Sequence, residues 1–320
     1  MIDISFADEL NNGFEKMMQW RNQIGYATCT YRSSIPPFIN YCIEHYPNGE
    51  YITSEMLDAW LSYYNYSPNS RATFISLVRE YSKFLCFLGR NDFIPDEDYS
   101  TKRIPYSPFI FTNKELLLLF DSLDDYKGVT CAKRFQPELV LPVYSRLLFL
   151  AGMRPNEPPA LLKEDVDLKT GDVYIRCSKR HKDRHIIISD TLLELCNYYN
   201  ELIANENREW FFQRWDGKPY ETYWYYNHFQ KCWERSQEFR RGNPRPYDLR
   251  HTFASVNLVK WLEEGKDAME LLPYLSAYMG HSEITSTLYY VHLLPDRLRQ
   301  KVKIDLDQLA KIYGKEGIVY

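Results

Sequence analysis

One stretch of the chain, residues 246–292, holds residue types that together can act on a phosphate group. Tyr247 and Arg250 are three positions apart, so they share a face if the segment is helical. His281 follows an apolar run and a glycine, and Tyr290 lies nine residues beyond it, directly after another tyrosine. Arginine can hold an anionic phosphate, and a tyrosine oxygen can attack it. These residues therefore predict phosphoryl transfer with a tyrosine nucleophile.

A further arginine lies upstream, at the end of an expected buried helix. Residues 137–152 are mostly apolar, and Arg154 follows them almost at once. A charge in such a place needs an ionic partner or a bound anion, because burying it unpaired is costly. Glu157 and Asp165 are the candidate partners, and a phosphate is the alternative.

A basic hairpin follows. Residues 172–176 and 184–189 alternate as two short strands would, and SKRHKD forms the turn between them. This turn presents Lys179, Arg180 and Lys182, which could reach a phosphate or a nucleic-acid groove. A solvated basic loop is the plainer interpretation of the same residues.

Length and composition indicate a globular protein with room for two domains. The chain has 320 residues, of which 45% are hydrophobic and 26% are charged. No apolar run is long enough to span a membrane, and the first residues, MIDISFADELNN, do not resemble a signal peptide, so we expect a cytoplasmic protein. The seven cysteines are scattered without a CxxC pair, which favours free thiols over disulfides or a zinc site.

The net charge of −4 argues mildly against nucleic-acid binding, but its distribution matters more than its sum. Basic residues gather in 176–184 and in 235–250, whereas acidic residues gather in short runs elsewhere. Basic patches on an acidic protein are compatible with DNA binding.

The predicted elements divide the chain into two domains. Four helices are expected within residues 1–90, and the last of them carries Arg71, Arg79 and Lys83, either as a solvated face or as a DNA-facing stripe. Residues 91–109 hold three prolines and no periodicity, so we expect a linker there. The second domain, residues 110–320, begins with a capping box at Thr112 and ends with an amphipathic helix over 296–313.

The second half of the chain resembles the tyrosine recombinase (phage integrase) family. Three segments carry the resemblance: AGMRPNEPPALLKEDVDL, SKRHKDRHIIIS, and PYDLRHTFAS followed by MGHSEITSTLYYVH. They agree with the family in order and spacing from Arg154 to Tyr290. The implied fold is mainly α with a small β-hairpin: an N-terminal four-helix, SAM-like core-binding domain, followed by an α+β catalytic domain. The match of the first domain rests only on the number and position of its helices.

The resemblance also implies roles for individual residues. Arg154 and Arg250 would hold the scissile phosphate, since a guanidinium donates two parallel hydrogen bonds and keeps its charge. Lys179 would protonate the leaving 5′ oxygen, with Lys182 as the nearest rival. His281 would donate to the phosphate or position the nucleophile. Tyr290 would be the nucleophile, whereas the adjacent Tyr289 is expected to be a packing residue.

Tyr247 departs from the family pattern. The family usually has a histidine at this position, and histidine can move a proton near neutral pH. Tyrosine can donate a hydrogen bond to a phosphate but is a poor base at that pH. Tyr247 therefore remains a candidate phosphate contact, or a packing residue at the start of its helix, and the route of the nucleophile's proton stays open.

The implied function is site-specific DNA recombination, through a 3′-phosphotyrosine intermediate and a Holliday junction. The expected partners are double-stranded DNA and three further copies of the chain, in a tetramer on two DNA sites whose C-terminal helices are exchanged between protomers. No membrane, metal or other cofactor is expected. The alternatives are a type IB topoisomerase-like nicking and resealing enzyme, and a DNA-binding relative that has lost the chemistry.

Overall fold

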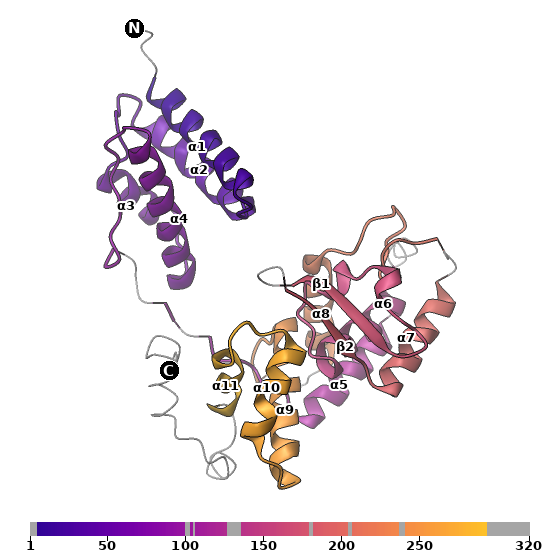
Figure 1. Cartoon of the computed structure of the whole chain (residues 1–320). Coiled ribbons are helices and arrows are strands. Elements are labelled where there is room, and N and C mark those ends of the chain that lie inside the picture. The colour runs from indigo at the N-terminus through magenta and orange to yellow at the C-terminus, as the bar shows by residue number, and fades with distance from the viewer. Residues whose placement is uncertain are drawn as a thin grey trace. The chain divides into compact units, whose positions relative to one another are not determined.

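The computed structural model describes residues 5–99, 103–104, 106–126, 136–178, 182–203, 207–236 and 241–292, without the side chains of 177, 178, 182 and 292 (Figure 1). Contacts divide the chain into two compact units, residues 1–106 and 107–320. The described elements are mainly helices, with one two-stranded antiparallel sheet in the second unit. This confirms the predicted fold class. No described helix is both long and apolar enough to cross a membrane.

The first unit is a bundle of four helices around one apolar core. The helices are α1 (Phe6–Gln23), α2 (Cys29–His45), α3 (Ser54–Tyr63) and α4 (Pro68–Phe87). Three of them begin at a serine or threonine whose side chain accepts a backbone N–H of the first turn: Ser5, Thr53 and Ser67. Buried aromatic and aliphatic side chains from all four helices fill the interior.

Helix α2 begins earlier than the sequence indicates. Proline favours the first turn of a helix, but α2 starts at Cys29 and carries Pro36 and Pro37 inside it. Each proline removes one helical N–H donor, which normally ends or kinks a helix. Tyr31 and Ile35, which precede the prolines, are buried in the core. Burying two such side chains stabilises by roughly 1.5–3 kcal/mol each, which offsets the lost hydrogen bonds.

The beginning of the expected linker packs on the first unit. The backbone N–H of Phe93 donates to the carbonyl of Ile52 at 2.8 Å, and the buried carboxylate of Asp92 accepts the Ile52 N–H at 2.7 Å. Arg79 of α4 donates to the carbonyl of Pro95 at 2.6 Å and also to that of Asp96. Residues 92–96 are therefore held by hydrogen bonds to the helical bundle.

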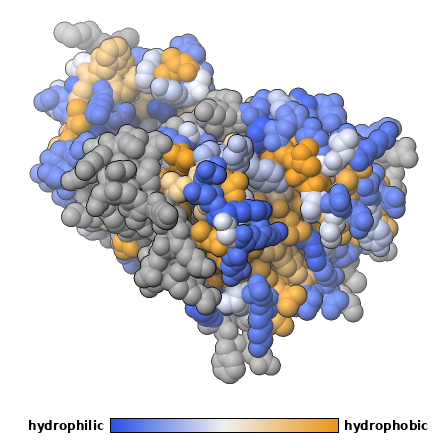
Figure 2. Space-filling model, turned by 60° about the horizontal axis from the view of Figure 1, so that its bottom comes forward, coloured by the Kyte–Doolittle hydropathy of each residue, from blue (hydrophilic) through white to orange (hydrophobic). Residues whose placement is uncertain are grey.

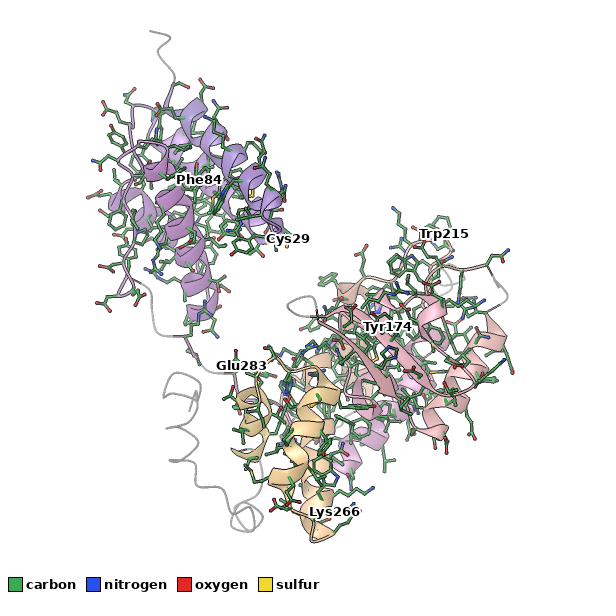
Figure 3. The ribbon with its side chains drawn as sticks, viewed as in Figure 1. Cys29, Phe84, Tyr174, Trp215, Lys266 and Glu283 are labelled. Carbon is green, nitrogen blue, oxygen red and sulfur yellow. The ribbon has the colours of Figure 1, made fainter. Side chains whose placement is uncertain are left out.

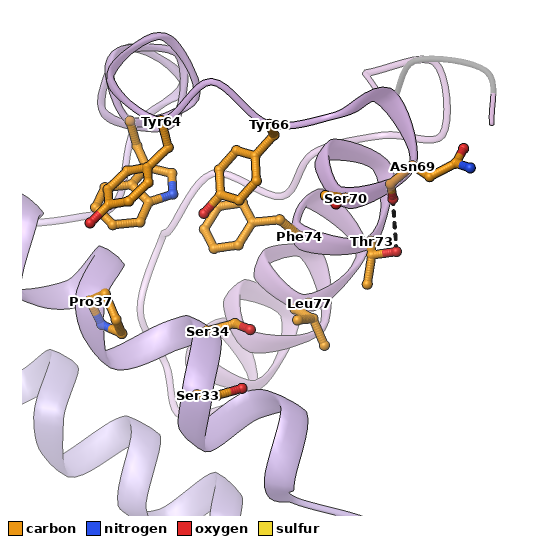
Figure 4. A pocket seen from close by; sticks show the side chains of 11 residues that line it. Ser33, Ser34, Pro37, Tyr64, Tyr66, Asn69, Ser70, Thr73, Phe74 and Leu77 are labelled. Atoms are coloured by element: carbon orange, nitrogen blue, oxygen red, sulfur yellow. Dashed lines mark hydrogen bonds between the residues drawn. The ribbon is translucent and has the colours of Figure 1, made fainter. Parts of the chain in front are cut away.

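A hollow of about 510 Å³ lies between α2, α3 and α4 in the first unit (Figure 4). Tyr64, Tyr66 and Phe74 form an aromatic wall, and serines of α2 face it from the other side. Asn69 and Thr73 on α4 are joined by a hydrogen bond of 2.9 Å at its rim. None of the residues predicted for phosphate chemistry lines this hollow.

The second unit is built around α6 (Pro137–Leu150), which packs against α5 (Asn113–Asp124), α7 (Asp190–Leu202), α8 (Thr222–Ser236) and α9 (Pro246–Glu263). The sheet pairs β1 (Asp172–Ser178) with β2 (Lys182–Ile187). Two short 3₁₀ turns, Pro158–Ala160 and Lys163–Asp165, connect α6 to the sheet. The predicted capping box at Thr112 is present at the start of α5.

A second cluster of buried residues joins α9 to α10 (Ala268–Met279) and α11 (Thr285–His292). The two turns at the ends of α10 lie far apart: Lys266 marks the turn before it and Glu283 the turn after it (Figure 3). On the face shown in Figure 2, hydrophobic residues form small groups among hydrophilic ones. The turn near Glu283 carries His281, so it brings a predicted site residue to one end of α10.

Candidate active site

Arg250 lies on α9 and is fully buried. Its guanidinium donates to two main-chain carbonyls, that of Gly152 after α6 and that of Met279 at the end of α10, the latter at 2.7 Å. The third nitrogen of the guanidinium, Nε, is also buried, and its N–H meets no acceptor among the described residues. Burial lowers the pKa of Arg250 from its usual value. An arginine side chain keeps its charge in proteins. An anion near this guanidinium would therefore be stabilised strongly.

Arg154 meets the same end of α10. Its guanidinium donates to the carbonyl of Gly280, the residue after Met279, and to Glu157 Oε1 at 2.8 Å. The arginines are 96 positions apart in sequence but bind consecutive carbonyls. The end of α10 therefore sets their spacing, as a site for one phosphate requires.

Glu157 holds Arg154 in place with the help of a residue that the sequence interpretation missed. Its carboxylate accepts the Arg154 N–H at 2.7 Å and both terminal nitrogens of Arg184 at 2.8 Å. Burial alone would raise the pKa of Glu157, but the hydrogen bonds and charge of Arg184, with the Arg154 N–H, lower it to about 2. The second candidate partner, Asp165, instead binds Arg176 at 2.6 Å.

Arg184 could have been found from strand alternation. Arg184, Ile186 and Ile188 share a face, and both isoleucines are buried. A charged residue on that face must have a buried partner. Its Nε also donates to the carbonyl of Tyr278 at 3.0 Å, so Arg184 ties the hairpin to the end of α10.

Gly280 must remain a glycine for two reasons. Its φ of +67° lies in the left-handed region, and a Cβ there would lie 2.8 Å from an Arg184 terminal nitrogen. Gly265, at the other end of α10, has a φ of +74° but no atom within 4 Å of a Cβ. Both glycines need a positive φ, but only at Gly280 would a Cβ also lie too close to another side chain.

We expect Gly280→Ala to lower the free energy of unfolding by about 1 kcal/mol more than Gly265→Ala, because only the first displaces Arg184. Chemical denaturation of both variants measures this difference. Gly280→Ala should also slow the phosphoryl transfer predicted from the sequence about tenfold, through Glu157 and Arg154, while Gly265→Ala should not. Equal effects of the two substitutions would show that Arg184 does not need this space.

Tyr290 lies on α11 with its side chain buried beside the arginines. Its Oη lies 3.1 Å from Nδ1 of His251, and its ring lies 6.2 Å from that of His281, nearly parallel to it. Burial raises the pKa of Tyr290 above its usual value, and the nearby charge of Arg250 offsets only part of that rise. The ring of Tyr289 stands nearly edge-on to that of Tyr290 and is only partly buried.

His281 is held by a buried threonine of α11. Thr287 is fully buried, and its hydroxyl lies 2.7 Å from His281 Nδ1. The helix turns this side chain inward, where it fixes the imidazole. Burial, followed by the charges of Arg250, Arg154 and Arg184, lowers the pKa of His281 to about 3. A neutral His281 can still donate an N–H to a phosphate oxygen.

Tyr247 opens α9 and is partly buried. Its ring lies 4.9 Å from that of His251, and the Arg250 guanidinium lies 6.0 Å from the centre of the tyrosine ring. The carboxylate of Asp248 accepts the N–H of Arg245 at 2.6 Å, which fixes the start of this helix. Tyr247 and His251 line a hollow of about 350 Å³ together with Arg245.

The structure describes the other predicted residues only in part or by themselves. Lys179 and Arg180 lie outside the described residues, and of Lys182 only the backbone, at the start of β2, is described. In the first unit, Arg79 is engaged with carbonyls, Lys83 pairs with Glu80 at 3.1 Å, and Arg71 is partly buried. Contact of these residues with DNA stays a prediction.

Comparison with known proteins decides the family. The sequence model of the phage integrase family matches residues 129–297, which is more than half of the chain. The chain belongs to the phage integrase family. Members of this family, the tyrosine recombinases, are DNA strand-exchange enzymes, so the predicted family and enzyme class are confirmed.

Individual relatives of this integrase-family chain cover most of its length. An integrase/recombinase of Sinorhizobium fredii (strain NBRC 101917 / NGR234), y4rE, is 26% identical over 297 residues, covering 90% of this chain and 93% of that protein. Tyrosine recombinase XerD of Staphylococcus aureus (strain N315) is 25% identical, covering 84% and 88%.

A solved structure shares the fold. The crystal structure of a lambda integrase dimer bound to a COC′ core site aligns with a TM-score of 0.62 at 16% identity, covering 93% of this chain and 80% of that one. At this identity the likeness concerns the fold alone, and it supports the fold class described above.

Proposed function

We propose that this protein is a site-specific DNA recombinase that cleaves and rejoins strands through a 3′-phosphotyrosine on Tyr290. One observation carries the proposal: two arginines anchored on the consecutive carbonyls of Met279 and Gly280 lie beside a buried tyrosine. Arg154 and Arg250 hold the non-bridging oxygens of the scissile phosphate. His281 donates to the same phosphate, Tyr247 contacts it from the start of α9, and Lys179 protonates the leaving 5′ oxygen.

The covalent intermediate keeps the energy of the broken phosphodiester bond, so rejoining needs no ATP. Positively charged side chains offset the charge on the phosphate, so the reaction needs no metal ion.

We propose that the protein acts on double-stranded DNA as a homotetramer that passes through a Holliday junction, with residues 296–313 exchanged between protomers. Residues 1–90 form the core-binding domain, with residues 91–109 linking it to the catalytic domain. The biological outcome is integration, transposition or resolution of DNA.

The family relatives support this proposal. One structural neighbour is described as a lambda integrase tetramer bound to a Holliday junction, with a TM-score of 0.61 at 16% identity. A tetramer on a Holliday junction is also the assembly proposed for this chain.

Trapping on a nicked DNA duplex carrying the protein's own site tests the cleavage step. Loss of the short fragment beyond the nick prevents rejoining, so we expect a protein–DNA adduct that survives denaturation, formed equally well in excess EDTA. Absence of an adduct on that site, or a strict metal requirement, would contradict the mechanism. Relaxation of supercoiled DNA without recombinant product would favour a topoisomerase.

A further inference from the structure

His251 stands where a proton acceptor for Tyr290 is needed. The two residues are 39 positions apart, yet the imidazole Nδ1 lies 3.1 Å from the phenol oxygen. Burial raises the pKa of Tyr290, so the phenol is protonated near neutral pH and must lose its proton as it attacks. Tyr247 cannot take that proton, because a phenol is a poor base at that pH.

We propose that His251 is the general base of the cleavage step, accepting the Tyr290 phenolic proton at Nδ1. This inference rests on the proposed tyrosine-mediated cleavage. The bond between Tyr290 Oη and phosphorus forms while the bond between phosphorus and the 5′ oxygen breaks. The phenolic proton moves to His251, and the 5′ oxygen takes a proton from the general acid, Lys179 in the proposed mechanism. Rejoining reverses both transfers.

The surroundings of His251 keep it able to accept a proton. Burial, followed by the charges of Arg250 and Arg245, lowers the pKa of His251 to about 4, so the imidazole is neutral at pH 7. A phosphodiester anion bound by the arginines offsets those charges, which makes the imidazole more basic when substrate is present. The titratable and charged groups around the ring are Arg245, Tyr247 and Arg250 of the α9 segment, Tyr290 of α11, His281 of the turn before it, and Tyr226 of α8 across the hollow.

The hollow beside His251 gives small molecules access to the ring. It measures about 350 Å³, and its lining includes Pro155, Tyr226, Arg245 and Tyr247 together with His251. Removing the imidazole enlarges this space next to the Tyr290 hydroxyl. A small base added to the solution can therefore enter and replace the missing ring.

Single-turnover cleavage of the nicked DNA tests the inference with two substitutions. His251→Asn places an amide near the position of Nδ1, so it can hydrogen-bond to Tyr290 but cannot accept its proton. His251→Ala removes both properties. At pH 7 we expect both variants to form the adduct about 100-fold more slowly than the unchanged protein, because general bases contribute roughly 10²–10⁴-fold.

The pH dependence separates a base from a positioning residue. Without His251 the phenol ionises directly to solvent, so the rate of each variant rises about tenfold per pH unit. The ratio of wild-type to variant rates should fall accordingly from pH 6 to pH 9, and groups common to both proteins cancel in that ratio. Imidazole should accelerate His251→Ala but not Tyr290→Phe.

Two results would overturn the assignment: a wild-type rate for His251→Asn, or a ratio that does not change with pH. Either would leave His251 as a positioning residue only. Failure of the unchanged protein to form any adduct would instead contradict the proposed function, so the two failures are distinguishable.

Discussion

Tyr290→Phe is expected to abolish the covalent DNA adduct, with less than about one thousandth of the wild-type rate remaining. The phenol oxygen is the proposed nucleophile, and no other group at this site replaces it. Removing the hydroxyl also removes its contact with His251, which costs only about 1 kcal/mol of folding free energy. Adduct formation on nicked DNA, measured with a melting curve for each protein, separates lost chemistry from lost fold.

Tyr289→Phe is the matched control, since it removes the same atom one residue earlier. Tyr289 is only partly buried, and its ring stands edge-on to that of Tyr290. We expect this variant to react within about twofold of the unchanged protein. If Tyr289→Phe loses the adduct and Tyr290→Phe keeps it, the nucleophile has been assigned to the wrong tyrosine.

Arg154→Lys is expected to slow adduct formation by about 10²–10³-fold while DNA binding changes little. A lysine keeps the charge but cannot bind Glu157, the Gly280 carbonyl and a phosphate at once. Removing one preorganised hydrogen-bond donor to an oxygen of the transition state lowers the rate by about 10²–10³-fold in comparable sites. The single-turnover rate at saturating protein measures the chemical step, and a gel-shift titration measures DNA binding.

The control is Arg146→Lys, on the helix that leads to Arg154. Arg146 binds both carboxylate oxygens of Asp124 at 2.7 Å in a partly exposed ion pair. Pairs of this kind contribute roughly 0–1 kcal/mol, so the variant should cleave at the wild-type rate. Equal loss of rate in both variants would point to general destabilisation rather than to a phosphate contact by Arg154.

The sequence was sufficient to predict a structural element where the pattern depended on neighbouring residues. The capping box at Thr112 and the alternation of residues 172–176 depend on neighbours within a few positions, and the structure has both elements there. Helix α2 differs because burial of Tyr31 and Ile35 outweighs the local effect of two prolines. Tertiary packing overrides local preference whenever the buried area is large enough.

By itself, the sequence determined the family, the fold class and a short set of candidate residues, because residue types at fixed spacing carry that information. Only the tertiary structure decided which residues meet. Arg154 pairs with Glu157 rather than with Asp165. Glu157 also binds Arg184, because the hairpin that carries Arg184 packs against the end of α10. His251 meets Tyr290 because α9 and α11 pack in one core. Such contacts join segments tens of residues apart, and they depend on how whole helices pack, which no local spacing specifies.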